Sequence, residues 1–249
     1  MTDIKRLPAA FIEQCIEKEN NDFAIAKELV EYLFRDMAKL CKKYDNDSFF
    51  DLPYTYSERR LDSVLLPALS KLCDSKVLVE LPATRQCNTR RFQVNESSGR
   101  IDYWCVYKGY SFVIELKHSY DCFTTPTTRD DKVTSRWIKM NEQLQSIEKE
   151  IKRYVEETKG VIRLGLHVIT SYSDKEPDNQ LIAQFDKSIP STIERFLRDL
   201  SRPYPSLKPD LLICWKIPHQ MVLKGAQTFP GLWIIAKIYP AIRHHGSKL

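Results

Sequence analysis

Two carboxylates face each other across a β-hairpin that the sequence predicts over residues 100–117. Two segments of alternating polarity flank a Lys108-Gly109 turn, and a two-residue loop there sets the register of the hairpin. This register puts Asp102 opposite Glu115 on one face of the sheet, and Lys117 shares that face. Facing carboxylates repel each other, so we expect a cation between them. Oxygen ligands of this kind suit Mg²⁺ or Mn²⁺.

The run Gly-Arg-Ile-Asp102 … Val-Ile-Glu115-Leu-Lys117 resembles the PD-(D/E)xK signature of the restriction-endonuclease-like nuclease superfamily, over about residues 56–170. Ile101 stands where the signature has proline. The resemblance implies an α/β fold with an α-β-β-β-α-β core and a mixed central sheet. It also implies that Asp102 and Glu115 bind Mg²⁺, that Lys117 assists the attacking water, and that the substrate is DNA rather than RNA.

A Glu-x-Lys on a strand also has an ordinary explanation, which is a solvated sheet face with a cross-strand ion pair. The apolar residues 112–114 before Glu115 favour a strand that is buried on both faces, and therefore favour an active site. Two other functions stay open at this point. The chain could be a nucleic-acid-binding module without catalysis, or a protein-interaction module with a coincidental motif.

Two helices flank the motif, and each carries one polar residue near its apolar face. Glu58 lies near the start of a helix over residues 56–73, and the resemblance implies that it reaches the metal site. A first-turn Glu that complements the helix dipole is the alternative, and Pro67 would displace Glu58 if it started a new helix. Gln143 lies on a helix over residues 135–158, where the resemblance implies a place near the scissile phosphate. An ordinary boundary residue is the alternative.

Basic residues cluster on both sides of the motif, within a chain of net charge +5. Such residues could meet phosphates along a cleft, although each could also be part of a solvated surface. The residues expected to bind nucleic acid are Arg59, Arg90, Arg91, Arg100, Arg129, Arg136 and Lys139.

The rest of the chain predicts one nuclease domain over residues 1–249, with a helical accessory at 1–50 and a C-terminal sheet extension at 171–249. Dimerisation or DNA contact by the accessory, and hence a homodimer, stays open. The expected elements are two helices within 8–43, a connector at 44–55, a strand at 77–84, a loop or edge excursion at 85–98, a polar connection at 118–135, a strand at 161–170 parallel to the motif strand, a helix at 192–200, and strands at 211–215 and 232–238.

Composition limits where the protein can act. The chain is 43% hydrophobic, but none of its apolar runs approaches the length of a membrane span, so we expect no membrane partner. The N-terminal residues lack the apolar core of a signal peptide. The seven cysteines are odd in number and have no C-x-x-C spacing, which favours reduced thiols in the cytoplasm over disulfides or a zinc site.

Overall fold

In the computed structural model, the chain has α/β architecture. A mixed eight-stranded sheet runs in the order β1-β6-β8-β5-β4-β3-β2, with β7 paired to β8. The described residues are 10–14, 20–46, 52–55, 57–88, 94–124, 131–147, 151, 158–176, 178–201, 204–216, 222–224 and 227–243. The strands are β1 (Ala10–Gln14), β2 (Val77–Asn88), β3 (Val94–Tyr107), β4 (Tyr110–Cys122), β5 (Val161–Ser173), β6 (Leu211–Lys216), β7 (Val222–Lys224) and β8 (Gln227–Ile238).

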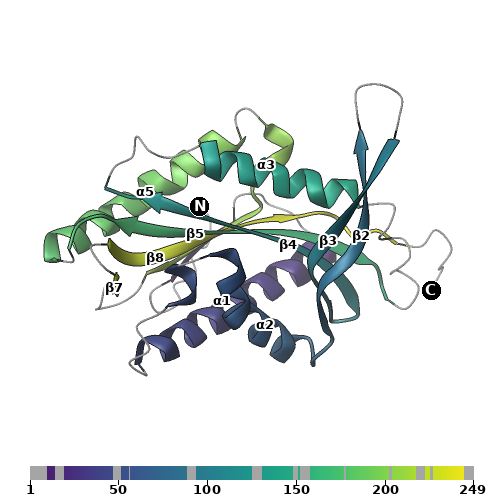
Figure 1. The fold of residues 1–249 in the computed structure, drawn as a ribbon, viewed down its shortest axis with the longest axis horizontal. Helices are drawn as coiled ribbons and strands as arrows, with labels where there is room; N and C mark the ends of the chain where they lie inside the picture. Colours follow the sequence, from purple (N-terminus) through teal and green to yellow (C-terminus); the bar gives the residue numbers. More distant parts are fainter. Residues whose placement is uncertain are drawn as a thin grey trace.

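Helices cover both faces of the sheet (Figure 1). The helices are α1 (Asn21–Asn46), α2 (Glu58–Leu72), α3 (Asp131–Ser146) and α5 (Asn179–Ser201), with short 3₁₀ turns η1 (Pro53–Thr55) and η4 (Pro205–Leu207). The helices α1 and α2 bury apolar side chains such as Leu33 and Leu65 against one face. The helices α3 and α5 cover the other face with side chains such as Trp137 and Phe185. Burial of these two apolar layers supplies the main driving force for folding.

The motif hairpin forms with the predicted register. Tyr107 pairs with Tyr110 across a two-residue turn. Lys108 and Gly109 in that turn have φ angles of 50° and 82°, as a type I′ turn requires. The strand β5 then pairs in parallel with β4 after the helix α3, so the predicted parallel pair is confirmed. From α2 to β5, the elements follow one another as helix, three strands, helix and strand.

Several predicted elements are corrected. A helix was expected from residue 8, but residues 10–14 form β1, which adds to the sheet edge by pairing with β6. Pairing with an existing edge outweighs the local helical pattern of so short a segment. The stretch expected as a loop or excursion at 85–98 instead continues β2 and β3 as a two-stranded arm that projects from the molecule (Figure 1).

The boundaries of three further elements also differ from the prediction. The strand β4 continues to Cys122, into the stretch expected to be a polar connection. The helix α3 begins at Asp131, earlier than expected, and ends at Ser146. Beyond it Ile151 is helical, and the other residues of the predicted stretch 148–157 lie outside the described residues. The helix α5 begins at Asn179, well before the predicted residue 192. Within the described segments, no helix has the length and apolar character needed to cross a membrane.

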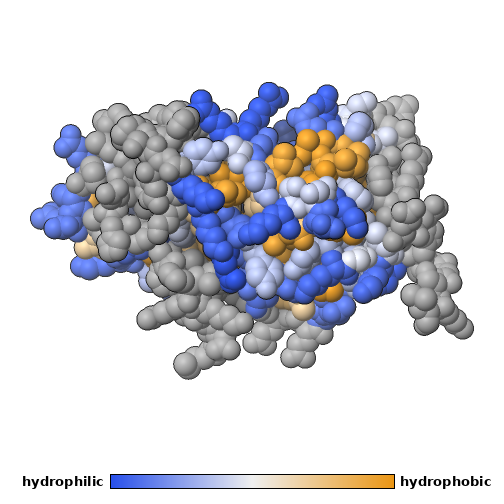
Figure 2. Space-filling model, turned by 90° about the horizontal axis from the view of Figure 1, so that it is seen from below, coloured by the Kyte–Doolittle hydropathy of each residue, from blue (hydrophilic) through white to orange (hydrophobic). Residues whose placement is uncertain are grey.

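Figure 2 views the molecule from below, on the side of α1 and α2. Hydrophilic side chains dominate the visible surface, and hydrophobic side chains gather toward the right of the view. Five large apolar or aromatic side chains are exposed among the described residues: Tyr32, Leu78, Val79, Tyr120 and Tyr204.

Candidate active site

The sheet forks at the motif. The strands β3 and β4 pair from the turn back to Tyr103 and Ile114, and there their ladder ends. Upstream of this point β3 stays with β2 in the projecting arm, whereas β4 continues beside β5 as far as Cys122. The register places Asp102 and Glu115 next in line, immediately beyond the last paired residues. The two carboxylates therefore lie where the strands diverge.

Side-chain carboxylates replace the missing strand along the β3 side of β4. The backbone N–H of Leu116 donates a hydrogen bond of 2.6 Å to Asp102 Oδ2. The N–H of His118 donates one of 3.1 Å to Glu58 Oε2. Two amide groups that a neighbouring strand would normally bind are thus satisfied by acids. A buried amide without an acceptor is costly, so these bonds fix both carboxylates at the fork.

Basic side chains bind the carbonyl groups on the same edge. Lys117 Nζ donates a hydrogen bond of 2.8 Å to the carbonyl oxygen of Leu116. The Arg136 guanidinium, from α3, donates to the carbonyl oxygen of His118. The edge of β4 is therefore lined by alternating acidic and basic side chains that are held by its own backbone.

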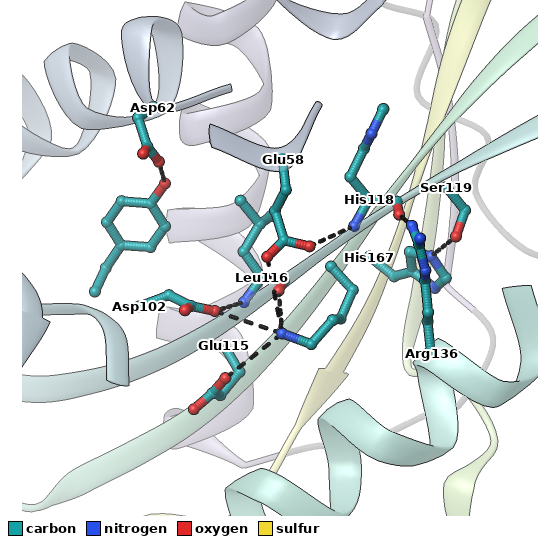
Figure 3. Close-up of polar contacts among 11 residues, drawn as sticks. Glu58, Asp62, Asp102, Glu115, Leu116, His118, Ser119, Arg136 and His167 are labelled. Carbon is teal, nitrogen blue, oxygen red and sulfur yellow. Dashed lines mark hydrogen bonds and ion pairs between the residues drawn. The ribbon is translucent and has the colours of Figure 1, made fainter. Parts of the chain in front are cut away.

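Three carboxylates surround the Lys117 ammonium group (Figure 3). Lys117 Nζ lies 3.9 Å from Asp102 Oδ2, 3.9 Å from Glu115 Oε2 and 4.0 Å from Glu58 Oε1. The cluster runs from the interior to the surface, because the Glu115 side chain is 0% exposed and the Glu58 side chain is 41% exposed. The Lys117 ammonium thus lies where the three carboxylates meet, and the Mg²⁺ or Mn²⁺ expected between them stays a prediction.

The donor atoms of the cluster are of the hard oxygen type. Carboxylates and the Leu116 carbonyl meet around one point, and such donors suit Mg²⁺ better than zinc. Among the described residues, no group of three or more His, Cys, Asp and Glu side chains is arranged as a metal site.

Glu58 reaches the cluster from the first residue of α2, which follows the N-cap residue Ser57. Pro67 lies inside α2 without dividing it, so it does not start a new helix or displace Glu58. Burial raises the pKa of the Glu58 carboxyl, and the nearby Asp102 charge raises it further. Lys117, the His118 amide and Arg136 oppose this shift, with Lys117 the strongest of the three. Glu58 therefore holds a proton more tightly than an ordinary glutamate.

Two buried histidines brace the strands next to the site and were not predicted from the sequence. His118 Nε2 lies 2.9 Å from Thr170 Oγ1, and His167 Nε2 lies 2.8 Å from Ser119 Oγ. Burial lowers the pKa of His118 to about 4 and that of His167 to about 3, so both rings are neutral near pH 7. They join β4 to β5 without adding charge. The apolar neighbours Leu166 and Val168 could have placed His167 inside, whereas Lys117 and Ser119 flank His118 and give no such signal.

Tyr103 and Asp62 form a second contact that was not predicted. The Tyr103 hydroxyl on β3 donates a hydrogen bond to the Asp62 carboxylate on α2 (Figure 3). Burial raises the pKa of Tyr103, and the charge of Asp62 raises it further. Asp62 lies one turn after Glu58 on α2, and Tyr103 follows Asp102 on β3. The hydrogen bond therefore holds the helix that carries Glu58 against the strand that carries Asp102.

Gln143 lies on α3, which packs across β4 and β5. Its Oε1 atom is buried and accepts no hydrogen bond from the described residues. The helix approaches the sheet closely over Gly165, the β5 residue opposite Glu115, because a Cβ there would lie 2.6 Å from Met140 Cε. No described contact joins Gln143 to the carboxylates, so its predicted role stays a prediction.

The predicted nucleic-acid-binding residues fall into three groups. Arg136 lies at the site, and Arg59 is exposed on α2 directly after Glu58. Lys139 is exposed on α3, one turn after Arg136, whereas Arg100 forms an exposed ion pair with Glu80 on the arm. Arg90, Arg91 and Arg129 lie outside the described residues.

Comparisons with known proteins add little to this geometry. No protein family model matches the chain, and no curated protein matches it. A solved structure described as the crystal structure of SSO0001 matches with probability 0.97, a TM-score of 0.24 and 17% sequence identity, over 61% of this chain and 65% of that chain. The match thus covers less than two thirds of that structure, and a TM-score this low carries no argument about fold or function.

Proposed function

We propose that this protein is a metal-dependent nuclease that hydrolyses phosphodiester bonds, with DNA as the preferred substrate. The observation that carries the proposal is the convergence of Glu58, Asp102 and Glu115 on the Lys117 ammonium at the fork of the sheet. Four charged groups from three separate elements seldom gather at one point for stability alone, because three carboxylates repel one another. Clusters of this kind are typical of catalytic sites.

The order of elements supports the same proposal. The segment from α2 to β5 runs helix, three strands, helix and strand, with β4 and β5 parallel. This order resembles the α-β-β-β-α-β core of restriction-endonuclease-like nucleases, and we propose that fold for the chain. The site residues occupy the corresponding elements, with Glu58 on the first helix and Asp102, Glu115 and Lys117 on the hairpin.

The residues present fit a magnesium ion. Asp102 and Glu115 would hold it, with the Leu116 carbonyl beside them and Glu58 on the exposed side of the cluster. When bound, such an ion polarises a phosphoryl oxygen and lowers the pKa of a coordinated water.

The protein's own residues supply positioning and charge. Lys117 is placed to orient the attacking water and to stabilise the charge that develops on the phosphate in the transition state. Arg136 brings a guanidinium, a group suited to phosphate recognition, to the same edge of β4. Glu58, with its raised pKa, can exchange a proton with solvent at the mouth of the cluster.

The proposed location is the cytoplasm. The five cysteines whose side chains are described, Cys41, Cys73, Cys105, Cys122 and Cys214, are all buried free thiols. Free thiols are typical of proteins in a reducing compartment.

The test is cleavage of plasmid, linear duplex and single-stranded DNA, and of RNA, in Mg²⁺ and in EDTA. We expect Mg²⁺-dependent cleavage that Asp102→Asn abolishes. Asp186→Asn on α5 is the matched control, because this exposed aspartate pairs with Lys216, outside the cluster. Absence of cleavage under all of these conditions would contradict the proposal. So would equal activity of the Asp102→Asn and Asp186→Asn variants.

A further inference from the structure

Tyr120 is an exposed aromatic side chain on the part of β4 that lies beyond its pairing with β3, three residues after Lys117. It is 39% exposed, and it is one of only five large apolar or aromatic side chains that are exposed among the described residues. A strand rises roughly 3.3 Å per residue, so Tyr120 lies roughly 10 Å along the strand from Lys117. Side chains alternate along a strand, so the Tyr120 ring lies on the face opposite to Lys117, which is the face from which α2 brings Glu58 to the same edge of β4.

The Tyr120 ring is held in place by other rings. Its centroid lies 4.8 Å from that of His118, at an interplanar angle of 76°, and 6.3 Å from that of Tyr172, at 84°. Neither neighbour is stacked in parallel with Tyr120. His118 is itself anchored to Thr170, so the support for the ring is rigid. A ring that is already ordered loses little conformational entropy when a ligand stacks on it.

A positive charge lies between this ring and the carboxylates. The Arg136 guanidinium is bound to the carbonyl of His118, between Lys117 and Tyr120 in the sequence of β4. Its charge acts on both neighbours, since it lowers the pKa of Glu58 and that of Tyr120 against the raising effect of burial. Along one strand edge the chain therefore presents a carboxylate cluster, a guanidinium and an aromatic ring.

We infer that Tyr120 and Arg136 form a binding site for one unpaired nucleotide, in which the base stacks on Tyr120 and a phosphate binds Arg136. This inference rests on the proposed nuclease function and narrows its substrate to single-stranded or frayed DNA. Bases inside a duplex are stacked on their neighbours on both faces, so a protein ring can stack only on an unpaired or terminal base. Stacking of bases on aromatic side chains beside a basic groove is typical of single-strand binding.

The experiment measures binding in Ca²⁺, which can occupy an oxygen site without supporting rapid cleavage. The probes are a single-stranded oligonucleotide and a blunt duplex, each with one 2-aminopurine whose fluorescence falls when it stacks. Tyr120→Ala should weaken single-strand binding by roughly 5- to 150-fold and abolish the quenching. Binding of the duplex should change little.

Matched variants separate stacking from a structural effect. Tyr32→Ala and Tyr204→Ala remove tyrosines that are 38% and 44% exposed, outside the site, and both should bind like the parent. Tyr120→Phe and Tyr120→Trp keep the aromatic face, so both should keep the single-strand affinity and the fluorescence quenching of the parent. These two variants still test the inference if Tyr120→Ala does not fold.

Two results would overturn the inference while leaving the nuclease function standing. In the first, the parent protein cleaves DNA, and a folded Tyr120→Ala variant binds the single strand as tightly as the parent does. The second is an equal loss of affinity for both probes. If the parent neither binds nor cleaves any DNA, the proposed function fails, and the inference fails with it.

Discussion

Replacing Lys117 with Met tests whether the carboxylate cluster depends on its central ammonium. Met keeps an unbranched side chain of similar length and removes only the charge and the donor. Without the ammonium, Glu58, Asp102 and Glu115 would each lose the positive charge that lies 3.9 to 4.0 Å from them, and they would repel one another. The metal-free variant should therefore be less stable than the parent at neutral pH.

The expected size follows from the burial of each partner. Two unit charges 4 Å apart attract by about 4 kcal/mol at an effective dielectric constant of about 20. Glu58 and Asp102 are partly exposed, so each of these pairs contributes at most about 1 kcal/mol net. Glu115 is 0% exposed, and loss of one partner of a buried pair costs about 3–5 kcal/mol. We expect a net loss of about 3 kcal/mol, which lowers the Tm by roughly 6–12 °C for a chain of this size.

Thermal and urea unfolding, followed by circular dichroism in EDTA at pH 7, measure this loss. Lys187→Met on α5 is the control, because Lys187 is exposed and should change stability by less than about 0.5 kcal/mol. Two further conditions identify the cause. Mg²⁺ at about 100 times its Kd stabilises a folded protein by about 2.7 kcal/mol, and it should bind more tightly once the ammonium no longer competes for the carboxylates. A given Mg²⁺ concentration should therefore stabilise Lys117→Met more than the parent and narrow the difference in stability between them.

Lower pH should also narrow the difference in stability between Lys117→Met and the parent. Lys117 lowers the pKa of the Glu58 carboxyl in the parent, so this pKa rises further when the ammonium is absent. A carboxyl with a raised folded-state pKa stabilises the fold at low pH and loses this effect as pH rises through that pKa. Equal stability of Lys117→Met and Lys187→Met in EDTA would refute the reasoning. A gap that stays constant with Mg²⁺ and with pH would show that Lys117 contributes packing rather than charge.

Three other predictions concern single residues of the site. Asp102→Asn can still accept the Leu116 amide hydrogen bond, so it should fold while plasmid cleavage in Mg²⁺ falls on the order of a hundredfold or more. Glu58→Gln can still accept the His118 amide hydrogen bond. Because the Glu58 pKa is raised, its ionisation destabilises the fold as pH rises, so this variant should melt above the parent at pH 7 in EDTA and lose that advantage at roughly pH 4. Arg136→Ala and Lys139→Ala should each weaken DNA binding across a salt series in Ca²⁺ and flatten its slope by roughly one unit per lost contact, whereas Lys187→Ala should not.

The hairpin was predictable because local chemistry determines it. Lys108-Gly109 permits the positive φ angles of a tight turn, and the turn fixes the register of both strands. Register then fixes the faces, so the amino-acid sequence alone is enough to place Asp102, Glu115 and Lys117 together. The alternating pattern over residues 161–170 predicted a strand, and the order of strand, helix and strand predicted its parallel pairing with β4.

The features that were missed depend on contacts between distant segments. The strand β1 forms because β6 offers an edge, and its own five residues carry no decisive pattern. The projecting arm keeps polar residues 85–88 in a strand because β3 supplies their hydrogen-bond partners. The hydrogen bond of Glu58 to His118 joins residues 60 positions apart, and periodicity could place Glu58 on an inward face but could not supply its partner.

The fork of the sheet accounts for both the stability and the chemistry of the site. When β3 leaves β4, the amides of Leu116 and His118 lose their strand neighbour, and an acid on that side restores each hydrogen bond. Glu58 is held to the His118 amide through Oε2 and turns Oε1 toward the Lys117 ammonium, whereas Asp102 Oδ2 both accepts the Leu116 amide hydrogen bond and lies nearest to the ammonium. An amide side chain keeps the hydrogen bond to the backbone but lacks the negative charge. The amide variants of Asp102 and Glu58 should therefore separate the structural role of each side chain from its role in the chemistry of the site, which alanine variants cannot do.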